Sequence, residues 1–295
     1  MEKTLVSVIT VTYNRGKLLE RCIRSVLNQT YTNIEHIVID GGSDDETDFV
    51  VEKYQGDKRL KYIKLSENRN VFLNYNYGAS QAKGDLITYL DSDDEYLPEK
   101  IEKQVELINT LPSDYGMVYC WMTYFDSSQN DAFMHVHKAE LRGYVPIEAS
   151  VYPCVSGTPT LLIRKEAFWS VGGFDDKAEM TTDWEFCARL CHKWKVDYVP
   201  ESLVNVYVNH MYDRLTNRMK SKAFLKKRIA MHEYYIKEFK ETFNKRPGSR
   251  WYNYKFLAYY SLKNHNIGKT IKYSFLYIIN TTINYVYERF INSPE

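Results

Sequence analysis

Strand-like and helix-like segments alternate through the first hundred residues, and this alternation constrains the fold more than any other feature. Runs rich in β-branched residues predict four strands, at 5–12, 36–40, 60–65 and 86–90. Between them, apolar residues recur at helical spacing and predict helices at 18–29, 47–54 and 72–82. Strands that alternate with helices are typical of an α/β domain with a mostly parallel sheet flanked by helices.

The remaining chain predicts further elements and a change of character near residue 210. Amphipathic helices are predicted at 98–111, 182–194 and 219–243. Residues 115–165 mix aromatic-rich strands with polar loops, and two or three helices rich in Tyr and Lys close the chain. We therefore expect an α/β domain over residues 1–210 and a basic, aromatic-rich helical region over residues 211–295.

The charge is distributed unevenly along the chain. The 39 Lys and Arg nearly cancel the 38 Asp and Glu, and 44% of the residues are hydrophobic, which excludes disordered, fibrous and disulfide-stapled classes. Residues 1–210 nevertheless carry a net charge of −10, whereas residues 211–295 carry +11. The near-neutral total therefore conceals an acidic domain and a basic helical region.

Targeting and redox signals are few. The N-terminus has no signal-peptide pattern, and no run of about 18 uncharged apolar residues predicts a spanning helix. The five cysteines are odd in number and show no CxxC spacing, so we expect buried thiols in a cytoplasmic protein. Cys187, Cys191 and His192 share one helical turn and could face a metal, although structural burial is the simpler interpretation.

Polar residues follow three of the predicted strands, and ligands of open α/β sheets bind beyond such strand ends. They are Tyr13-Asn14, residues 40–44 and the acidic run Asp91-Ser92-Asp93-Asp94. Three carboxylates in four residues repel one another unless a cation lies beside them, and Mg²⁺ or Mn²⁺ prefers carboxylate and phosphate oxygens. The alternative is a solvated acidic turn before the helix at 98–111.

Several motifs together resemble those of the family 2 glycosyltransferases of the GT-A fold. They are VSVITVTYN at 6–14, LNQTY at 27–31, IVIDGGSDDET at 37–47, AKGDLITYLDSDD at 82–94, GGFD at 172–175 and TTDWEF at 181–186. Their order and spacing match the family over about residues 4–210. The resemblance implies an inverting hexosyltransferase that takes a sugar from a nucleoside diphosphate donor, usually UDP-linked, and makes residues 1–210 the nucleotide-sugar-binding and catalytic domain.

The resemblance also implies roles for donor-side residues. Thr10, Thr12 and Tyr13 would border the nucleobase, and Asp40 would hydrogen-bond the base or ribose, with Gly41 where many members have a second acid. Asn76 would contact phosphate or sugar, in a segment that lacks the family's usual Gly and Arg. Asp91 and Asp93 would be the DxD pair that holds Mg²⁺ or Mn²⁺, and Asp91 and Ser92 would lie beside the diphosphate.

On the acceptor side, the resemblance makes Asp183 the general base, with Glu185 as the substitute. The alternative is an acid that merely favours the start of a helix. Trp184 would offer an aromatic face to a sugar, and Thr158 would line the acceptor side. Arg214, in the loop after His210, would pair with the diphosphate.

The basic region leaves two interpretations open. Phe275, Ile279, Ile283, Val286 and Phe290 form an apolar stripe that could pack against the catalytic domain or a second subunit. Alternatively, the Lys, Arg and Tyr around it suit an anionic membrane surface at the inner face of the cell membrane, where a lipid-linked saccharide acceptor would be found.

The function we expect is transfer to a lipid-linked saccharide with a β-glycosidic product, in lipopolysaccharide or capsule synthesis. A sugar-phosphate nucleotidyltransferase is an alternative, but residues 13–16 make a poor phosphate loop. A degenerate scaffold or carbohydrate-binding subunit is another, which the intact DSDD and TTDWE motifs disfavour. No nucleic-acid-binding motif accompanies the basic region.

Overall fold

The computed structural model describes residues 4–153, 155, 157–175, 182–212 and 222–290. The chain divides into two compact units. Unit 1 comprises Met1–Val145, Cys154–Lys177 and Arg189–Tyr212, and unit 2 comprises Pro146–Pro153, Ala178–Ala188 and Asp213–Glu295. A basic helical region was expected from residue 211 onward, and unit 2 adds two short segments of the preceding sequence to that region.

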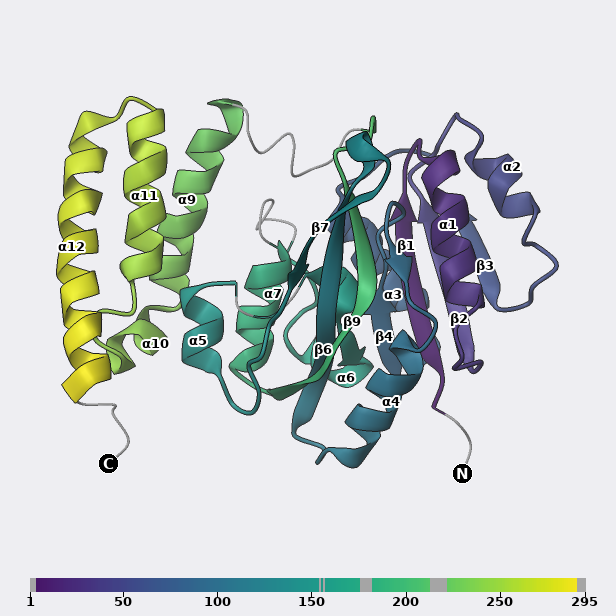
Figure 1. Cartoon of the computed structure of the whole chain (residues 1–295), viewed down its shortest axis with the longest axis horizontal. Helices are drawn as coiled ribbons and strands as arrows, with labels where there is room; N and C mark the ends of the chain where they lie inside the picture. The colour runs from purple at the N-terminus through teal and green to yellow at the C-terminus, as the bar shows by residue number, and fades with distance from the viewer. Residues whose placement is uncertain (1–3, 154, 156, 176–181, 213–221, 291–295) are drawn as a thin grey trace. The chain divides into compact units, whose positions relative to one another are not determined.

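Unit 1 is built on a mixed, mostly parallel sheet (Figure 1), which has nine strands among the described residues. The strands are β1 (Val6–Thr12), β2 (Ile34–Asp40), β3 (Leu60–Lys64), β4 (Leu86–Tyr89), β5 (Glu95–Tyr96), β6 (Tyr115–Asp126), β7 (Ala132–His137), β8 (Leu162–Arg164) and β9 (Lys195–Val208). Their order is β3-β2-β1-β4-β8-β6-β9-β5, and β7 pairs with β6. The block β3-β2-β1-β4 is wholly parallel, which confirms the predicted α/β class.

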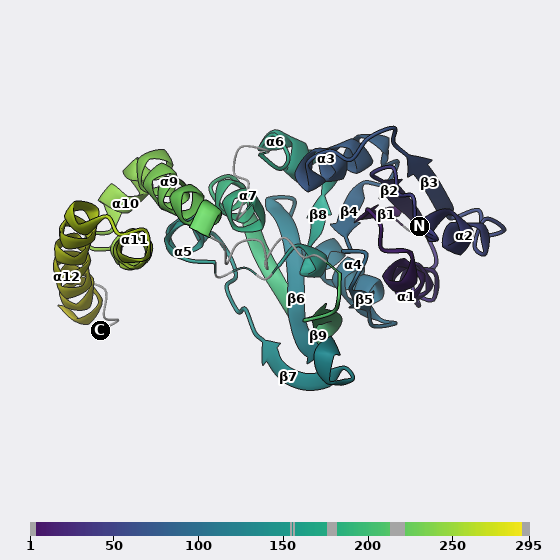
Figure 2. The same ribbon diagram turned by 90° about the horizontal axis from the view of Figure 1, so that it is seen from above.

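Helices cover both faces of this sheet. Those of unit 1 are α1 (Gly16–Leu27), α2 (Thr47–Glu52), α3 (Val71–Gln81), α4 (Lys100–Thr110) and α6 (Lys165–Ser170), with the short 3₁₀ turns Ser127–Gln129 and Thr158–Thr160. Figure 2 shows α1 and α4 on one face and α3 and α6 on the other. The strands are therefore buried on both sides, as their continuous apolar runs predict.

Two close approaches hold β1 between its covering helices. On one face, Val6 and Val8 pack in a core with the apolar residues of α1 such as Ile23. On the other face, Gly78 of α3 lies so near Ile9 that an added Cβ would come within 2.4 Å of the Ile9 side chain. The glycine thus sets the spacing between α3 and β1.

Unit 2 is helical and has two cores. Its elements are α5 (Pro146–Val151), α9 (Lys222–Glu238), α10 (Lys240–Lys245), α11 (Trp251–Lys263) and α12 (Ile267–Phe290), together with the start of α7 (Thr182–Cys191). One core gathers around Trp184 and Tyr235, and the other around Leu257 and Tyr273. None of the described helices combines the length and apolarity needed to cross a membrane.

The single helix predicted over 219–243 is interrupted. At Phe239 the backbone turns to φ −95° and ψ 25°, so α9 ends at Glu238 and α10 begins at Lys240. Phe239 and Phe243 are both buried in the same core. The continuous apolar spacing predicted which side chains are buried but not this local break.

Candidate active site

The carboxyl ends of β1, β2 and β4 meet at one edge of the sheet. The register pairs Thr12 with Asp40 and Ile9 with Tyr89, so that the chain leaves all three strands in the same direction. Tyr13, Asp40 and Asp91 consequently lie at this edge, which is where ligands of open α/β sheets bind.

Hydrogen bonds join the loops that follow β1 and β2. The backbone N–H of Asn14 donates to Ser43 Oγ at 2.8 Å, and the N–H of Asp44 donates to Asn14 Oδ1 at 3.0 Å. The N–H of Gly16 donates to Asp45 Oδ2 at 3.0 Å at the start of α1. The two loops are therefore held together at the sheet edge by hydrogen bonds.

Asp40 is fully buried, and both of its carboxylate oxygens accept hydrogen bonds. Its Oδ1 accepts hydrogen bonds from the N–H and the hydroxyl of Ser43, at 3.0 and 2.5 Å. The Tyr62 hydroxyl lies 2.6 Å from Asp40 Oδ2 and 2.7 Å from Asp48 Oδ1. Burial, together with these carboxylates, raises the pKa of Tyr62 and keeps it protonated. A base or ribose contact of Asp40 stays a prediction, and Oδ2 keeps acceptor capacity for one further hydrogen bond.

The three residues predicted to border a nucleobase lie in different surroundings. The Thr10 hydroxyl lies 2.9 Å from His36 Nε2 inside the core, so this side chain packs within the strand and we no longer assign it to the donor. Thr12 is at the strand end, and its buried hydroxyl has no hydrogen-bond partner in the described part of the chain. The ring of Tyr13 is 44% exposed and is the accessible aromatic surface of the three.

Three of the four residues of the acidic run after β4 are buried, contrary to a solvated turn. Ser92, Asp93 and Asp94 are each exposed by 2% or less. Arg15 Nη1 lies 3.2 Å from Asp93 Oδ1, and His210 Nε2 lies 2.9 Å from Asp93 Oδ2. The protein's own basic side chains therefore surround Asp93, which the sequence interpretation had assigned to a bound cation alone.

Further contacts position the rest of the run. An Arg21 guanidinium N–H donates to the carbonyl of Asp93 at 2.7 Å, and the same guanidinium lies 3.4 Å from the centre of the Tyr207 ring. The backbone N–H of Tyr207 donates to Asp94 Oδ1 at 3.1 Å. The Tyr75 hydroxyl donates to Asp91 Oδ1, and burial is the main cause that raises the pKa of Tyr75.

Asn76, predicted to contact donor phosphate or sugar, is used within the protein. Its Nδ2 donates to the carbonyl of Phe174 at 2.8 Å, and its Oδ1 accepts from the Phe174 N–H at 3.0 Å. Gly173 has φ +68°, and an added Cβ there would lie 2.7 Å from Asn76 Oδ1. Through these two bonds Asn76 fastens the GGFD turn to α3, and its contact with donor phosphate or sugar stays a prediction.

This turn also supports Asp91 through aromatic packing. The Phe174 ring lies 5.9 Å from the ring of Tyr75 and 5.1 Å from that of Tyr89. Tyr75 in turn holds Asp91. The GGFD motif thus orients the first carboxylate of the acidic run from a segment some eighty residues later in the chain.

The donor atoms fit a hard divalent cation only if a substrate supplies further ligands. No group of three or more His, Cys, Asp or Glu in the described residues is arranged to hold a metal. Mg²⁺ in nucleotide sites commonly binds one or two carboxylates and takes its other ligands from phosphate and water. Asp91 and Asp93 provide such a pair, and the buried Ser92 Oγ beside them has no hydrogen-bond partner among the described side chains and backbone.

The residues predicted for the acceptor side begin α7, in unit 2. Burial raises the pKa of Asp183, and the backbone N–H of Trp184, which donates to Asp183 Oδ1 at 2.8 Å, opposes that shift. Glu185 is fully buried. A carboxylate whose pKa is raised toward neutrality is a better proton acceptor than an ordinary one.

Trp184 does not offer a face to a sugar. Only 6% of it is exposed, its ring stacks on Tyr235 with centroids 4.2 Å apart, and its Nε1–H donates to the carbonyl of Ala149 at 2.7 Å. The sequence prediction is wrong here, because the indole has both its apolar surface and its polar group buried in the core of unit 2.

Other predicted residues are only partly placed. Thr158 is buried in a 3₁₀ turn of unit 1, where its acceptor role stays a prediction. Arg214 lies outside the described residues. Cys187 and Cys191 are buried in α7 and belong to no metal-binding group in the described part of the chain.

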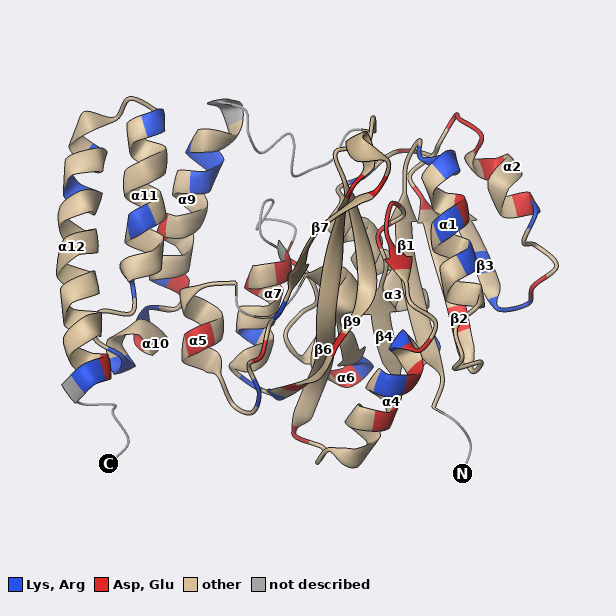
Figure 3. Cartoon of the chain, viewed as in Figure 1, with Lys and Arg blue, Asp and Glu red and all other residues tan. Residues whose placement is uncertain are grey.

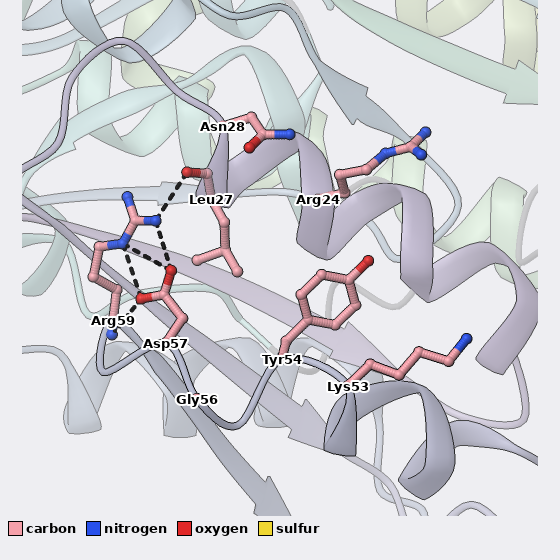
Figure 4. A pocket seen from close by; sticks show the side chains of 8 residues that line it. All are labelled: Arg24, Leu27, Asn28, Lys53, Tyr54, Gly56, Asp57 and Arg59. Atoms are coloured by element: carbon pink, nitrogen blue, oxygen red, sulfur yellow. Dashed lines mark hydrogen bonds and ion pairs between the residues drawn. The ribbon is translucent and has the colours of Figure 1, made fainter.

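A surface pocket of about 360 Å³ lies elsewhere in unit 1 (Figure 4). It is bounded by the end of α1 and the turn before β3, and includes Arg24, Tyr54 and Arg59. Arg59 is already paired with Asp57 at 2.7 Å. Because this turn precedes β3, the pocket belongs to the opposite edge of the sheet from the strand ends and contains none of the predicted site residues.

The sequence interpretation missed Arg15, Arg21 and Tyr75. Arg15 was considered only within residues 13–16, as part of a poor phosphate loop. A basic residue directly after that strand was a usable signal, since it lies at the same predicted edge as the acidic run. Tyr75 gave no comparable signal, because its contact with Asp91 depends on how α3 faces β4.

Comparison with known proteins supports one family. The sequence pattern described as "Glycosyl transferase family 2" matches residues 7–171. An uncharacterized glycosyltransferase of Rickettsia typhi is 31% identical over 208 residues, covering 70% of this chain and 64% of the relative. A putative teichuronic acid biosynthesis glycosyltransferase, TuaG of Bacillus subtilis, is 32% identical over 165 residues, covering 56% of this chain and 64% of the relative. The chain thus spans less than two thirds of the length of these relatives.

Solved structures show the same fold. TarS 1–349 of S. aureus, in complex with UDP-GlcNAc, matches with a TM-score of 0.65 at 16% identity, covering 96% of this chain and 91% of that one. The mannosyltransferase PcManGT of Pyrobaculum calidifontis, in complex with GDP-Man and Mn²⁺, matches with a TM-score of 0.59 at 14% identity, covering 98% and 89%. At such identities the likeness concerns the fold alone.

Proposed function

The chain belongs to glycosyl transferase family 2, and from that premise we propose that it transfers a sugar from a nucleoside diphosphate donor, UDP-linked, to a saccharide acceptor. The observation that carries the proposal is the meeting of Tyr13, Asp40 and the Asp91–Asp94 run at one sheet edge. A nucleoside diphosphate sugar needs an aromatic ring to stack on its nucleobase and carboxylates to hold the metal ion on its diphosphate.

The donor-side residues divide the work of binding. The exposed ring of Tyr13 stacks on the nucleobase, and the unsatisfied Thr12 hydroxyl is available to it. Asp91 and Asp93 hold Mg²⁺ or Mn²⁺, which when bound offsets the negative charge that develops on the leaving diphosphate. Support for the metal comes from the donor atoms themselves and from the Mn²⁺ in the structure of PcManGT. Arg15, beside Asp93, is near enough to neutralise further charge.

We propose Asp183 as the general base. Its raised pKa makes it a competent acceptor for the proton of an attacking hydroxyl. Attack from the face opposite the leaving group inverts the anomeric centre, so an α-linked donor gives a β-linked product. No covalent intermediate with the protein is needed.

The acceptor is proposed to be a lipid-linked saccharide of surface polysaccharide synthesis, at the inner face of the cell membrane. TuaG is described as a putative teichuronic acid biosynthesis enzyme, and the helical region carries the positive charge that a lipid diphosphate or anionic membrane attracts. On this proposal, the sheet-edge residues bind the donor, and Asp183 accepts the proton of the acceptor hydroxyl.

The test is a panel of UDP- and GDP-sugars incubated with the full chain and Mn²⁺ or Mg²⁺, read as release of nucleoside diphosphate. We expect release with one UDP-sugar, dependent on the metal and lost in Asp93→Asn. Isothermal titration with UDP gives a readout independent of the acceptor. If no nucleotide sugar binds or turns over, with or without lipid acceptors, the proposal fails and the scaffold interpretation replaces it.

A further inference from the structure

The final helix, α12, exposes many large apolar side chains, which is unusual for a helix of a water-soluble bundle. Such helices turn apolar residues inward and polar residues outward. In α12, Asn280 and Asn284 lie on the inner side: an added Cβ on Gly248 would come within 2.6 Å of the Asn280 carbonyl and 2.3 Å of the Asn284 backbone nitrogen. Gly248, with φ +82°, permits this approach.

The outer side of α12 is apolar and exposed. Tyr273 and Leu276 pack inward against α11, so the opposite face of the helix points away from it (Figure 2). That outer face carries Ile267, Ile271, Phe275 and Ile278, which are 73, 66, 63 and 62% exposed, with Ile279, Ile283, Tyr285 and Val286 following at 36 to 56%. We call these eight residues the outer face of α12. So many exposed large apolar side chains on one helix mark an interaction site.

The charge around this face is of one sign. Residues 242–287 contain no Asp or Glu but seven Lys or Arg. Lys272 is exposed on α12, and Lys255 and Lys263 are exposed on α11. Glu288, the acid at the end of α12, is paired with Arg246. Figure 3 shows the cations distributed along α9, α11 and α12.

We propose that the outer face of α12 docks on a bilayer that contains anionic phospholipid, with the helix lying in the plane of the interface. Apolar side chains enter the acyl boundary, while Lys and Tyr side chains meet the headgroups, which is how interfacial helices bind. The 24 residues of α12 extend roughly 36 Å along that plane. Charge complementarity favours anionic lipid over a second copy, because another copy would bring the same cations against this face.

This docking surface rests on the proposed function only in that both place the chain at a membrane, and it can be tested independently of the transferase activity. Docking can be measured with neither donor nor acceptor present. A chain that binds vesicles but releases no nucleotide would contradict the proposed function alone, and an active chain that ignores vesicles would contradict the docking alone.

The experiment is flotation of the full chain with vesicles of phosphatidylcholine, alone or mixed with phosphatidylglycerol. We expect the chain to float with the mixed vesicles and to bind phosphatidylcholine at least about tenfold more weakly. The triple variant Ile271→Ser, Phe275→Ser, Ile278→Ser should lose flotation, because it removes the side chains that enter the bilayer. Lys272→Glu with Lys263→Glu should weaken binding to the mixed vesicles alone.

Matched controls separate docking from general stickiness. Phe49 and Phe133 are each 64% exposed in unit 1, so Phe49→Ser and Phe133→Ser should float like the wild type. Lys58→Glu, exposed in unit 1, should also leave flotation unchanged. All of these side chains are on the surface, and circular dichroism checks that each variant is folded.

Three results would overturn the proposal. The first is a wild-type chain that fails to float with the mixed vesicles, and the second is a triple variant that floats as well as the wild type. The third comes from light scattering after gel filtration: if the wild type is a dimer, the triple variant a monomer, and neither binds vesicles, then the outer face of α12 is an interface between copies of this chain.

Discussion

Arg15 and Asp93 form an ion pair across the opening of the sheet edge, with Nη1 and Oδ1 3.2 Å apart. On the other oxygen of the same carboxylate, His210 Nε2 lies at 2.9 Å. Asp93 is 2% exposed and would be costly to bury as an unpaired charge. These basic side chains therefore stabilise the acidic run, and a divalent cation has to compete with them for Asp93.

Removing Arg15 should strengthen metal binding. In Arg15→Gln the carboxylate of Asp93 loses a competing cation, and the repulsion between Arg15 and the bound metal ion disappears. At a partly exposed site these changes should strengthen metal binding by roughly 1–2 kcal/mol, or about tenfold in affinity. Titration of Mn²⁺, followed by the electron paramagnetic resonance signal of the free ion, measures this without any turnover.

The matched control for this prediction is Arg24→Gln, which changes an exposed arginine of α1, the helix that follows Arg15. It should bind Mn²⁺ as the wild type does. An Arg15→Gln variant whose Mn²⁺ affinity is unchanged or lower would show that Arg15 does not compete for the site.

Replacing Asp183 by Asn should separate binding from transfer. The amide keeps an oxygen that can accept the Trp184 N–H, so the first turn of α7 is preserved, but it cannot take a proton. We expect the affinity for UDP to stay within about twofold of the wild type, while kcat falls by at least about a hundredfold. Both are measured on the same preparation, by calorimetry and by nucleotide release.

The opposite outcome is equally informative. Unchanged transfer in Asp183→Asn would leave this carboxylate as a helix-start acid, and the equivalent change Glu185→Gln would then be the one to examine. Glu185 is fully buried, so its variant also needs a stability measurement.

The residues at the sheet edge could be predicted from the sequence, because each of them directly follows a recognisable strand. A β-branched run followed by polar residues places Tyr13, Asp40 and Asp91 at strand ends, and parallel strands send those ends to one side. The register of Thr12 opposite Asp40 confirms this placement. Motif spacing adds the family and hence the order of the strands.

Contacts between distant segments could not be predicted in this way. Asn76 and Phe174 are 98 residues apart, and their pairing depends on how the GGFD turn closes on α3. The apolar stripe of α12 was visible in the sequence, but periodicity alone cannot tell an inward face from an outward one. The inward packing of Tyr273 and Leu276 and the exposure of Phe275 establish its direction.

Asn76→Ala should destabilise unit 1 rather than weaken donor binding directly. The change leaves the N–H and the carbonyl of Phe174 without their amide partner, which costs about 2–3 kcal/mol. Urea denaturation measures this loss. Asn28→Ala, at an exposed position after α1, is the control and should change stability by less than about 0.5 kcal/mol.

Contradiction would come from the reverse pattern. If Asn76→Ala is as stable as the wild type but binds UDP or the donor sugar markedly more weakly, the amide contacts the donor as the family resemblance first implied.

Trp184→Phe should act on stability and not on acceptor recognition. Phenylalanine fills most of the space beside Tyr235 but cannot donate to the Ala149 carbonyl, so unfolding should become easier by about 1–2 kcal/mol. The KM for the acceptor should stay unchanged. Trp169→Phe, at a site that is 40% exposed, is the control, and an acceptor KM that rises only in Trp184→Phe would restore the sugar-stacking role.

His36 should make the protein less stable in mild acid. It is fully buried beside Thr10, and burial lowers its pKa to about 3 from an ordinary value of 6.5. Between these values the unfolded chain binds a proton that the folded chain does not, so stability is complete above pH 6.5 and falls by about 1.4 kcal/mol for each pH unit below it.

The variant His36→Gln tests this, because glutamine can still hydrogen-bond to Thr10 but cannot titrate. The free energy of unfolding of this variant, measured in urea between pH 7 and pH 5, should therefore fall less steeply than that of the wild type. The buried ring of His232 has a pKa near 4, but His232 is retained in both proteins, so its contribution cancels in the comparison. Parallel pH dependences for the two proteins would mean that His36 becomes protonated in the folded state without cost.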